Sequence, residues 1–210
     1  MDLFDTPERQ EILKDVILLR RFVAPVEDTV LPALASVIQM APFRNMMTPG
    51  GYPMSVATTS CGDWGWVSDK KGYRYAATDP LTDRGWPQMP ASFNRLARQA
   101  ACMAGFNHFA PDACLINRYQ PGARMGLHQD RDERDFSQPI VSVSLGISAV
   151  FQMGGFARSD KAMKLPLYHG DVLVWGGESR LRFHGVLPVK AGNHPALGEC
   201  RINLTFRKAV

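Results

Sequence analysis

Cysteine is scarce in this chain of 210 residues, and the four cysteines that occur lie far apart. Cys61, Cys102, Cys114 and Cys200 form no C-x-x-C pair, which argues against a zinc cluster and against a disulfide framework. Reduced thiols fit a reducing compartment best, so we expect a cytoplasmic protein.

Long apolar runs are also missing, so we expect no membrane-spanning segment. The first residues are polar and acidic, unlike a secretory signal. There is no internal repeat, no low-complexity tract and no segment that indicates an obligate interface, so we expect a monomer. The length suits one large domain with a substantial core. A formal net charge of +4 is compatible with a polyanionic partner but supports one only weakly.

Glycine (18) and proline (15) are plentiful, which favours a turn-rich β architecture over a helical bundle. We expect a loose terminus over 1–11 and helices over 27–40 and 90–104, with Ser92 as an N-cap and Pro32 tolerated only near the first turn of its helix. Strands are expected over 16–22, 113–119, 140–145, 150–153, 164–168, 171–175 and 201–207. Residues 42–90 indicate short hairpins and loops laid over a core. Many short strands with glycine-rich turns predict a mainly β (α+β) fold, a double-stranded β-helix jelly roll of the cupin type.

A candidate metal site is formed by His128-Gln129-Asp130 together with a single later histidine, His184. Side chains alternate along an extended segment, so His128 and Asp130 are expected to point the same way. Two imidazoles and one carboxylate are the ligands of non-haem Fe(II) sites with open positions. The H-x-D pattern alone also arises by chance, and His169 is a rival third ligand for which a structural role is favoured.

The segment Arg201–Arg207 alternates strictly between polar and apolar residues. Arg201, Asn203, Thr205 and Arg207 share one face, which predicts either a solvated edge strand or the polar wall of a pocket. In the second case two guanidinium groups can bind a dicarboxylate. Leu115, Asn117 and Tyr119 share a face of another expected strand. The alternative is that they are ordinary side chains of that strand with no binding role.

Aromatic and basic residues crowd the segment 60–86, where Lys70, Lys71, Arg74 and Arg84 lie among Trp64, Trp66, Tyr73, Tyr75 and Trp86. Aromatic rings stack on unpaired bases and cations hold phosphates, so the segment is a candidate nucleic-acid surface. The alternative is a minor hydrophobic cluster under a long loop. Asp132 is a candidate for a substrate hydrogen bond, although its charged run 130–135 also fits a solvated loop.

Six segments closely resemble the AlkB family of dioxygenases, and the resemblance runs from about residue 15 to 208. They are residues 48–55, 111–119, 121–130, 139–146, 169–180 and 201–207. The resemblance implies an Fe(II)- and 2-oxoglutarate-dependent enzyme that uses O₂ to demethylate alkylated bases. It implies an N-terminal extension over 1–111 with a nucleotide-recognition lid at about 42–90, and a catalytic jelly roll over 112–210, together one compact unit.

The same resemblance implies roles for individual residues. Iron would be held by His128, Asp130 and His184. The co-substrate 2-oxoglutarate would be held by Leu115, Asn117, Tyr119, Trp175, Arg201, Asn203 and Arg207. The substrate would be contacted by Thr48, Trp66, Tyr73, Arg74, Tyr75, Arg124, Arg131, Asp132 and Arg158. Arg124 and Arg131 stand where the family suggests Lys, and Thr58 stands where it suggests a Met lining the base pocket.

These roles give a concrete hypothesis for the reaction. Arg207, assisted by Tyr119, is expected to anchor the distal carboxylate of 2-oxoglutarate, while a flipped base stacks between Trp66 and His128. The implied substrates are 1-methyladenine and 3-methylcytosine in single- or double-stranded DNA, with RNA as a further candidate, and the products are formaldehyde, succinate and CO₂. Two alternatives stay open: the same chemistry on RNA or another substrate, and a non-enzymatic nucleic-acid-binding β-domain.

Overall fold

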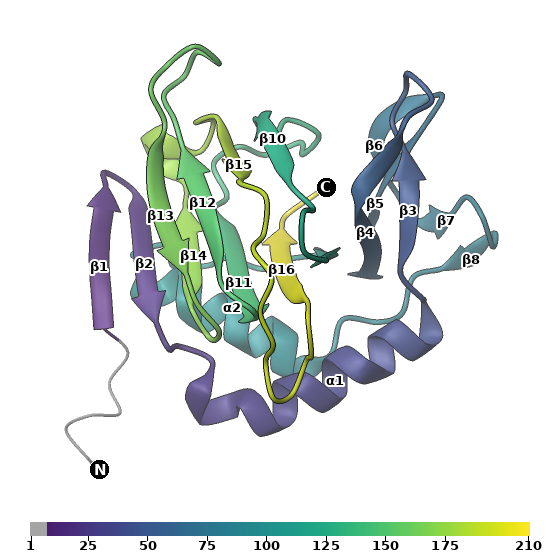
Figure 1. Ribbon diagram of the computed structural model, residues 1–210, viewed down its shortest axis with the longest axis horizontal. Coiled ribbons are helices and arrows are strands. Elements are labelled where there is room, and N and C mark those ends of the chain that lie inside the picture. The colour runs from purple at the N-terminus through teal and green to yellow at the C-terminus, as the bar shows by residue number, and fades with distance from the viewer. Residues whose placement is uncertain (1–7) are drawn as a thin grey trace.

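The computed structural model describes residues 8–210, and it is built around two antiparallel sheets (Figure 1). The large sheet has eight strands in the order β1-β2-β14-β11-β16-β9-β4-β3. Their bounds are β1 Glu8–Leu13, β2 Val16–Arg20, β14 Val172–Trp175, β11 Ile140–Gly146, β16 Arg201–Arg207, β9 Ala113–Tyr119, β4 Pro53–Gly62 and β3 Arg44–Met47. The small sheet has the order β10-β15-β12-β13, with β10 Met125–His128, β15 His184–Val186, β12 Ala149–Met153 and β13 Met163–Leu167.

One apolar core lies between these sheets, which together make the expected jelly roll. Leu18, Ile140 and Leu173 come from the large sheet, and Phe151 and Val186 from the small one. Period-two alternation put these side chains on the inner face, because successive residues of a strand point to opposite sides.

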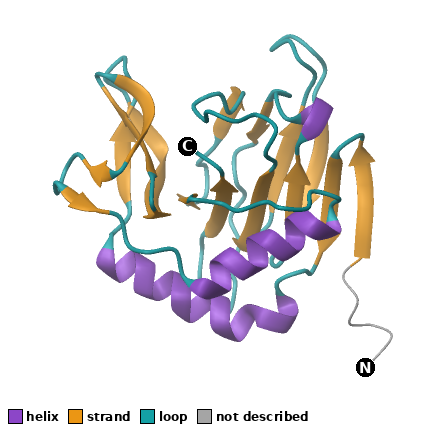
Figure 2. Ribbon diagram, turned by 180° about the vertical axis from the view of Figure 1, so that it is seen from behind, coloured by secondary structure: helices purple, strands orange, loops and turns teal. Residues whose placement is uncertain are grey.

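Two helices cover the other face of the large sheet (Figure 2). They are α1 Glu27–Met40, which follows a short 3-10 turn at Ala24–Val26, and α2 Ala91–Met103. Val30 and Leu34 of α1 and Phe93 and Leu96 of α2 pack on a second core with Phe206 and its neighbours in the sheet. In Figure 2 the helices lie across the base of the molecule, so the open end of the roll is left to loops and short strands.

Three local predictions were wrong. Residues 8–11, expected to be loose, belong to β1, because backbone pairing with β2 orders a segment with little apolar content. The N-cap of α2 is Pro90, with a φ of −56° and no side-chain cap, so Ser92 lies inside the first turn. Pro32 is the sixth residue of α1 and lies beyond its first turn, where it removes one backbone donor. The part of the expected loose terminus before residue 8 lies outside the described residues.

The predicted lid region divides between the large sheet and two small hairpins. β3 and β4 extend the sheet beyond β9, while β5 Gly65–Asp69 pairs with β6 Gly72–Ala76, and β7 Thr78–Asp79 pairs with β8 Arg84–Gly85. A small cluster of Met46, Val67 and Trp86 holds these parts together. Trp86 therefore has the structural role that was the alternative, and it packs so closely on Gly65 that a Cβ there would lie 2.1 Å from the indole.

The sheet order also bears on the predicted division at residue 111. In the large sheet the four strands from after that point lie side by side, with two strands from before it at each edge, so the predicted extension and core share one sheet. No helix within residues 8–210 has the length and hydropathy needed to cross a membrane. The small 3-10 turn Gly177–Ser179 lies between β14 and β15 and leads the chain toward His184.

Candidate metal centre and adjoining cavity

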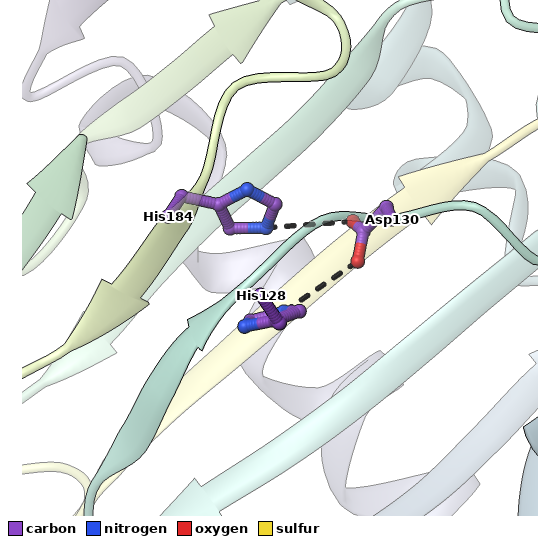
Figure 3. Close-up of side chains that lie close together, drawn as sticks. All are labelled: His128, Asp130 and His184. Carbon is purple, nitrogen blue, oxygen red and sulfur yellow. Dashed lines mark ion pairs between the residues drawn. The ribbon is translucent and has the colours of Figure 1, made fainter. Parts of the chain in front are cut away.

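His128, Asp130 and His184 converge at the open end of the jelly roll (Figure 3). One ligand atom from each lies within 4.8 Å of the others. His128 Nε2 is 3.5 Å from Asp130 Oδ1, and His184 Nε2 is 3.7 Å from Asp130 Oδ2. The third histidine candidate, His169, takes no part, because its Nδ1 accepts a hydrogen bond from the Gly146 amide.

Local backbone geometry explains this convergence. β10 and β15 are antiparallel partners in which His128 lies opposite His184, and Asp130 follows two residues after His128. Gly185 permits the close approach of the strands, because a Cβ there would lie 2.7 Å from the Met125 carbonyl oxygen. The H-x-D segment and the distant histidine thus meet through one strand pair.

Hydrogen bonds fix the orientation of both imidazoles. His128 Nδ1 is 2.9 Å from the Gly126 carbonyl oxygen, and His184 Nδ1 is 3.0 Å from the Arg182 carbonyl oxygen. Each bond requires the proton on Nδ1, which leaves Nε2 with a lone pair directed at the centre. Phe151 and Trp175 pack against His184, with ring centroids at 5.8 and 5.0 Å.

The electrostatics keep Asp130 ionised. Burial acts to raise the pKa of Asp130, but the Arg207 guanidinium and His184 hold that pKa well below its ordinary value. The pKa of His184 is lowered by burial and by the neighbouring His128. A neutral imidazole and a carboxylate are the forms that bind metal, so two histidines and one aspartate with an open side fit Fe(II). That open side is at His128, whose side chain keeps 37% of its surface exposed.

A cavity of about 350 Å³ opens beside this centre. The polar face of β16 forms one wall, so the prediction of a pocket wall is confirmed and the solvated edge strand is excluded: β16 lies between β11 and β9 in the sheet. Leu115, Asn117 and Tyr119 of β9 line the same cavity, as does Trp175. The apolar face of β16 packs in the helix-side core.

Arg201 is the most deeply buried cation of this wall, with 1% of its surface exposed. Its guanidinium lies 5.0 Å from the centre of the Tyr119 ring, and Nη2 donates to Ser144. Within the described residues its Nε and Nη1 have no partner, and neither has Asn117 Oδ1. Buried polar atoms without partners are costly, so the two guanidinium donors of Arg201 fit a bound anionic group such as the distal carboxylate of 2-oxoglutarate. Asn117 Oδ1 is an acceptor and needs a donor instead.

Arg207 is differently engaged. Its Nε and Nη2 donate to Asp130 Oδ2 at 3.0 and 2.6 Å, and Nε lies 3.2 Å from Glu133 Oε1. Arg207 therefore supports the metal ligand directly. This pairing disfavours the expectation that Arg207 anchors the distal carboxylate, because its charge is already balanced by two carboxylates.

The lid contributes an aromatic rim. Trp66 and Tyr73 both line the cavity, and their rings stack at 5.5 Å with 14° between planes. Trp66 Nε1 donates to Asp132 Oδ2 at 2.7 Å, so Asp132 is a cavity residue and its carboxylate is ordered by the lid. Arg158 also lines the cavity and donates to the Leu127 carbonyl.

Other predicted substrate residues do not line this cavity. Thr48 lies in the β3–β4 turn, where its hydroxyl accepts from the Tyr52 amide, and Arg74 is paired with Asp69 at 2.8 Å. Arg124 and Arg131 are exposed on the adjoining segments. The Tyr75 hydroxyl donates to Glu133 instead.

Thr58 stands where the resemblance suggests a Met of the base pocket. Thr58 is buried, with 1% of its surface exposed, and it lines a second cavity together with Arg44 and Asp79. It lies opposite Asn117 in the sheet, but it is not among the residues that line the metal-side cavity.

Two residues beside the metal centre were not predicted as site residues from the sequence. Glu133 and Arg180 form a buried ion pair at 3.0 Å beside Asp130. Glu133 sits in the charged run 130–135, which resembles a solvated loop, and Arg180 follows a turn. No local pattern separates them from exposed charges, because their burial depends on long-range packing.

Comparison with known proteins identifies the family to which this chain belongs. The model of the 2OG-Fe(II) oxygenase superfamily matches residues 15–207. The chain belongs to this superfamily. It is therefore an Fe(II)- and 2-oxoglutarate-dependent dioxygenase, and the alternative of a non-enzymatic binding domain is wrong.

Individual relatives agree with this assignment. The "Alpha-ketoglutarate-dependent dioxygenase AlkB" of Salmonella typhimurium is 54% identical over 212 residues, covering 100% of this chain and 98% of the relative. Its counterpart from Escherichia coli K12 is 52% identical over 211 residues, with the same coverage. The solved structure of OsALKBH1 superposes with a TM-score of 0.82 at 30% identity and covers 96% of this chain and 100% of that one. The "Nucleic acid dioxygenase ALKBH1" of Mus musculus is 35% identical over 135 residues, covering 64% of this chain and 34% of the relative.

Proposed function

We propose that this oxygenase demethylates N-alkylated bases in DNA by oxidation. Its near full-length relatives carry the name AlkB, and a more distant one is named a nucleic acid dioxygenase. The proposed lesions are 1-methyladenine and 3-methylcytosine, with formaldehyde, succinate and CO₂ as products. RNA is a second candidate substrate.

The observation that carries the proposal is a shared cavity. His128, Asp130 and His184 line it on one side, and the stacked Trp66 and Tyr73 line it from the lid. Base–aromatic stacking contributes about 1–3 kcal/mol per base, so such a rim is suited to an extruded base. With Fe(II), 2-oxoglutarate and O₂ bound, the centre supplies the oxidising power for attack on a methyl group.

The chain's own residues position both partners of the reaction. Arg201, with Tyr119 beside it, takes the distal carboxylate of 2-oxoglutarate, and Arg207 keeps Asp130 ionised and oriented. This assignment moves the distal carboxylate to Arg201, whereas the sequence led us to expect it at Arg207. Asn117 and Asn203 complete the polar wall around the co-substrate.

Asp132 gives a reason for preferring a methylated cationic base. Its carboxylate lies at the cavity rim, held by Trp66 Nε1. A nearby carboxylate favours a positive charge, and methylation at the pairing nitrogens of adenine or cytosine makes the base cationic. A neutral alkylated base would gain less from the same contact.

The deciding experiment measures formaldehyde and succinate from a single-stranded oligonucleotide carrying 1-methyladenine, with and without Fe(II) and 2-oxoglutarate. We expect both products, together with restored adenine, only when both components are present. Succinate without repair would keep the oxygenase and reject this substrate. A parallel series with the same lesion in RNA tests the second candidate.

The cellular state of the protein belongs to the same proposal. We propose a monomeric cytoplasmic enzyme, as the sequence leads us to expect. Sedimentation of the purified protein at several concentrations would test the monomer, and fractionation of cells would test the location.

A further inference from the structure

Glu133 is a buried carboxylate in a run of exposed charges. Only 6% of its surface is accessible, whereas Arg131, Asp132 and Arg134 around it are exposed. Removing a carboxylate from water is costly unless charged or hydrogen-bonded partners compensate. Its partners therefore explain why the chain turns this side chain inward.

Three partners from three separate elements converge on Glu133. The Tyr75 hydroxyl, from β6 of the lid, donates to Oε1 at 2.8 Å. Arg180, just after the Gly177–Ser179 turn, donates from Nη2 to Oε2 at 3.0 Å. Arg207, the last residue of β16, brings Nε within 3.2 Å of Oε1.

Both arginines also hold the metal-binding aspartate. Arg207 donates twice to Asp130 Oδ2, and Arg180 Nη1 donates to the Asp130 backbone carbonyl at 3.0 Å. Glu133 thus contacts directly both of the arginines that hold Asp130. Through the Tyr75 hydroxyl it also contacts the lid directly.

We propose that Glu133 is a positioning residue that couples the recognition lid to the metal centre. The chain of contacts runs from Tyr75 through Glu133 and Arg207 to Asp130. A divalent cation bound to Asp130 weakens the attraction between Asp130 and Arg207. Arg207 then interacts more strongly with Glu133, its other carboxylate partner in the described residues. The hydrogen bond from Tyr75 to Glu133 transmits this change to β6 and to its partner strand β5.

Such coupling is reciprocal. If metal and co-substrate favour the closed arrangement of the lid, then a ligand that closes the lid strengthens metal and co-substrate binding by the same factor. The assignment of the lid to nucleic acid rests on the proposed function. The link between lid and metal rests on the contacts of Glu133 alone.

The test is hydrogen exchange of the backbone amides in residues 65–76, measured on the full chain with and without Mn(II) plus 2-oxoglutarate. We expect loading to slow exchange in this hairpin by about 5-fold or more in the wild-type protein. In Glu133→Gln the difference between loaded and unloaded protein should vanish, although Mn(II) still binds. Asp135→Asn changes an exposed carboxylate of the same run and should keep the full difference.

A second variant covers the case in which Glu133→Gln does not fold, since it leaves two buried arginines with a weaker partner. Tyr75→Phe removes one hydroxyl and keeps Glu133 with both arginines. A merely structural tyrosine would speed exchange equally in both states and leave their ratio intact. The proposed role predicts that the ratio falls to about 1.

Two results would overturn the proposal: no response of the wild-type hairpin to loading, or an unchanged response in both variants. Neither result involves nucleic acid, so the coupling can fail while base repair is confirmed. Conversely, an enzyme that ignores methylated DNA could still show the coupling. The two proposals are therefore tested separately.

Discussion

Asp130 has two partners to satisfy, a metal ion and the buried Arg207. Because Arg207 keeps its carboxyl ionised, the site presents a ready anion to a divalent cation. Asp130→Asn preserves the shape but removes the charge. We expect Mn(II) affinity to fall more than about 100-fold, beyond the effect typical of residues that only support a ligand. Titration by electron paramagnetic resonance measures this, with Asp135→Asn as the control, and normal affinity would refute the ligand set.

Arg201 and Arg207 have the same side chain and different neighbours. Arg201 has unpartnered nitrogens, whereas Arg207 is bonded to two carboxylates. In Arg201→Met we expect the KM for 2-oxoglutarate to rise about 10- to 150-fold, since a hydrogen bond to a charged group contributes about 1.5–3 kcal/mol. Preference for 2-oxoglutarate over 2-oxopentanoate, which lacks the distal carboxylate, should fall as well.

The matching change at Arg207 separates the two assignments. Arg207→Gln should weaken Mn(II) binding, because Asp130 loses the cation that orients it, and should leave the preference between the two oxo acids largely intact. If that preference disappears in Arg207→Gln and survives in Arg201→Met, the sequence-based assignment is right after all.

At the scale of elements, regular alternation was the most informative sequence signal. β16 and β9 were predicted closely, because period two alone assigns Arg201 to one face and Ile202 to the other. The two helices, expected over 27–40 and 90–104, were also found close to those bounds. β10 and β15 are too short to carry a pattern, at four and three residues, so their pairing and the meeting of His128 with His184 came from the structure.

The sequence alone could not show which charged side chains are buried. Glu133 and Arg180 are enclosed by elements distant in the chain, and Glu133 has a charged residue on either side of it. The lid shows the same limit: Trp66 faces the cavity and Trp86 fills a small core, although both occur in one aromatic segment.

The β5–β6 hairpin carries a prediction about base recognition. Trp66→Ala should weaken binding of a methylated oligonucleotide about 5- to 150-fold, which corresponds to the stacking energy of one base. Turnover of 2-oxoglutarate without substrate should continue, because Trp66 does not touch the metal ligands. Fluorescence anisotropy and succinate release measure the two effects. Tyr168→Ala removes another exposed aromatic ring that does not line the cavity, and should change neither.

The turn of the same hairpin has its own electrostatics. Side-chain bonds from Arg74, and then the Lys71 amide, lower the pKa of Asp69 to about 2 from its ordinary value of 3.8. A lowered carboxyl pKa stabilises the hairpin above pH 3.8, and this contribution is lost as pH falls through about 2. The Asp69–Arg74 pair should therefore be indifferent to pH near neutrality.

Titration of Asp69 by nuclear magnetic resonance tests this pairing. Arg74→Gln should raise the pKa of Asp69 toward 3.8. An oligonucleotide that recruits Arg74 to a phosphate, as the sequence suggested, should raise it in the wild-type protein too. An unmoved pKa on DNA binding would assign Arg74 to the hairpin alone.

For the whole molecule, the metal centre is placed so that its ligands tie the two sheets together. His128 and His184 belong to the small sheet, while Arg207, which grips Asp130, ends β16 in the large one. A ligand that binds only the folded state stabilises it by about 2.7 kcal/mol at 100 times its Kd. Mn(II) with 2-oxoglutarate should thus raise Tm by about 5–10 °C for a chain of this size, and a chelator should reverse the shift. Asp130→Asn should show no shift at the same concentrations. A shift with 2-oxoglutarate alone, equal to that with metal, would mean that the polar wall binds the co-substrate without the metal centre.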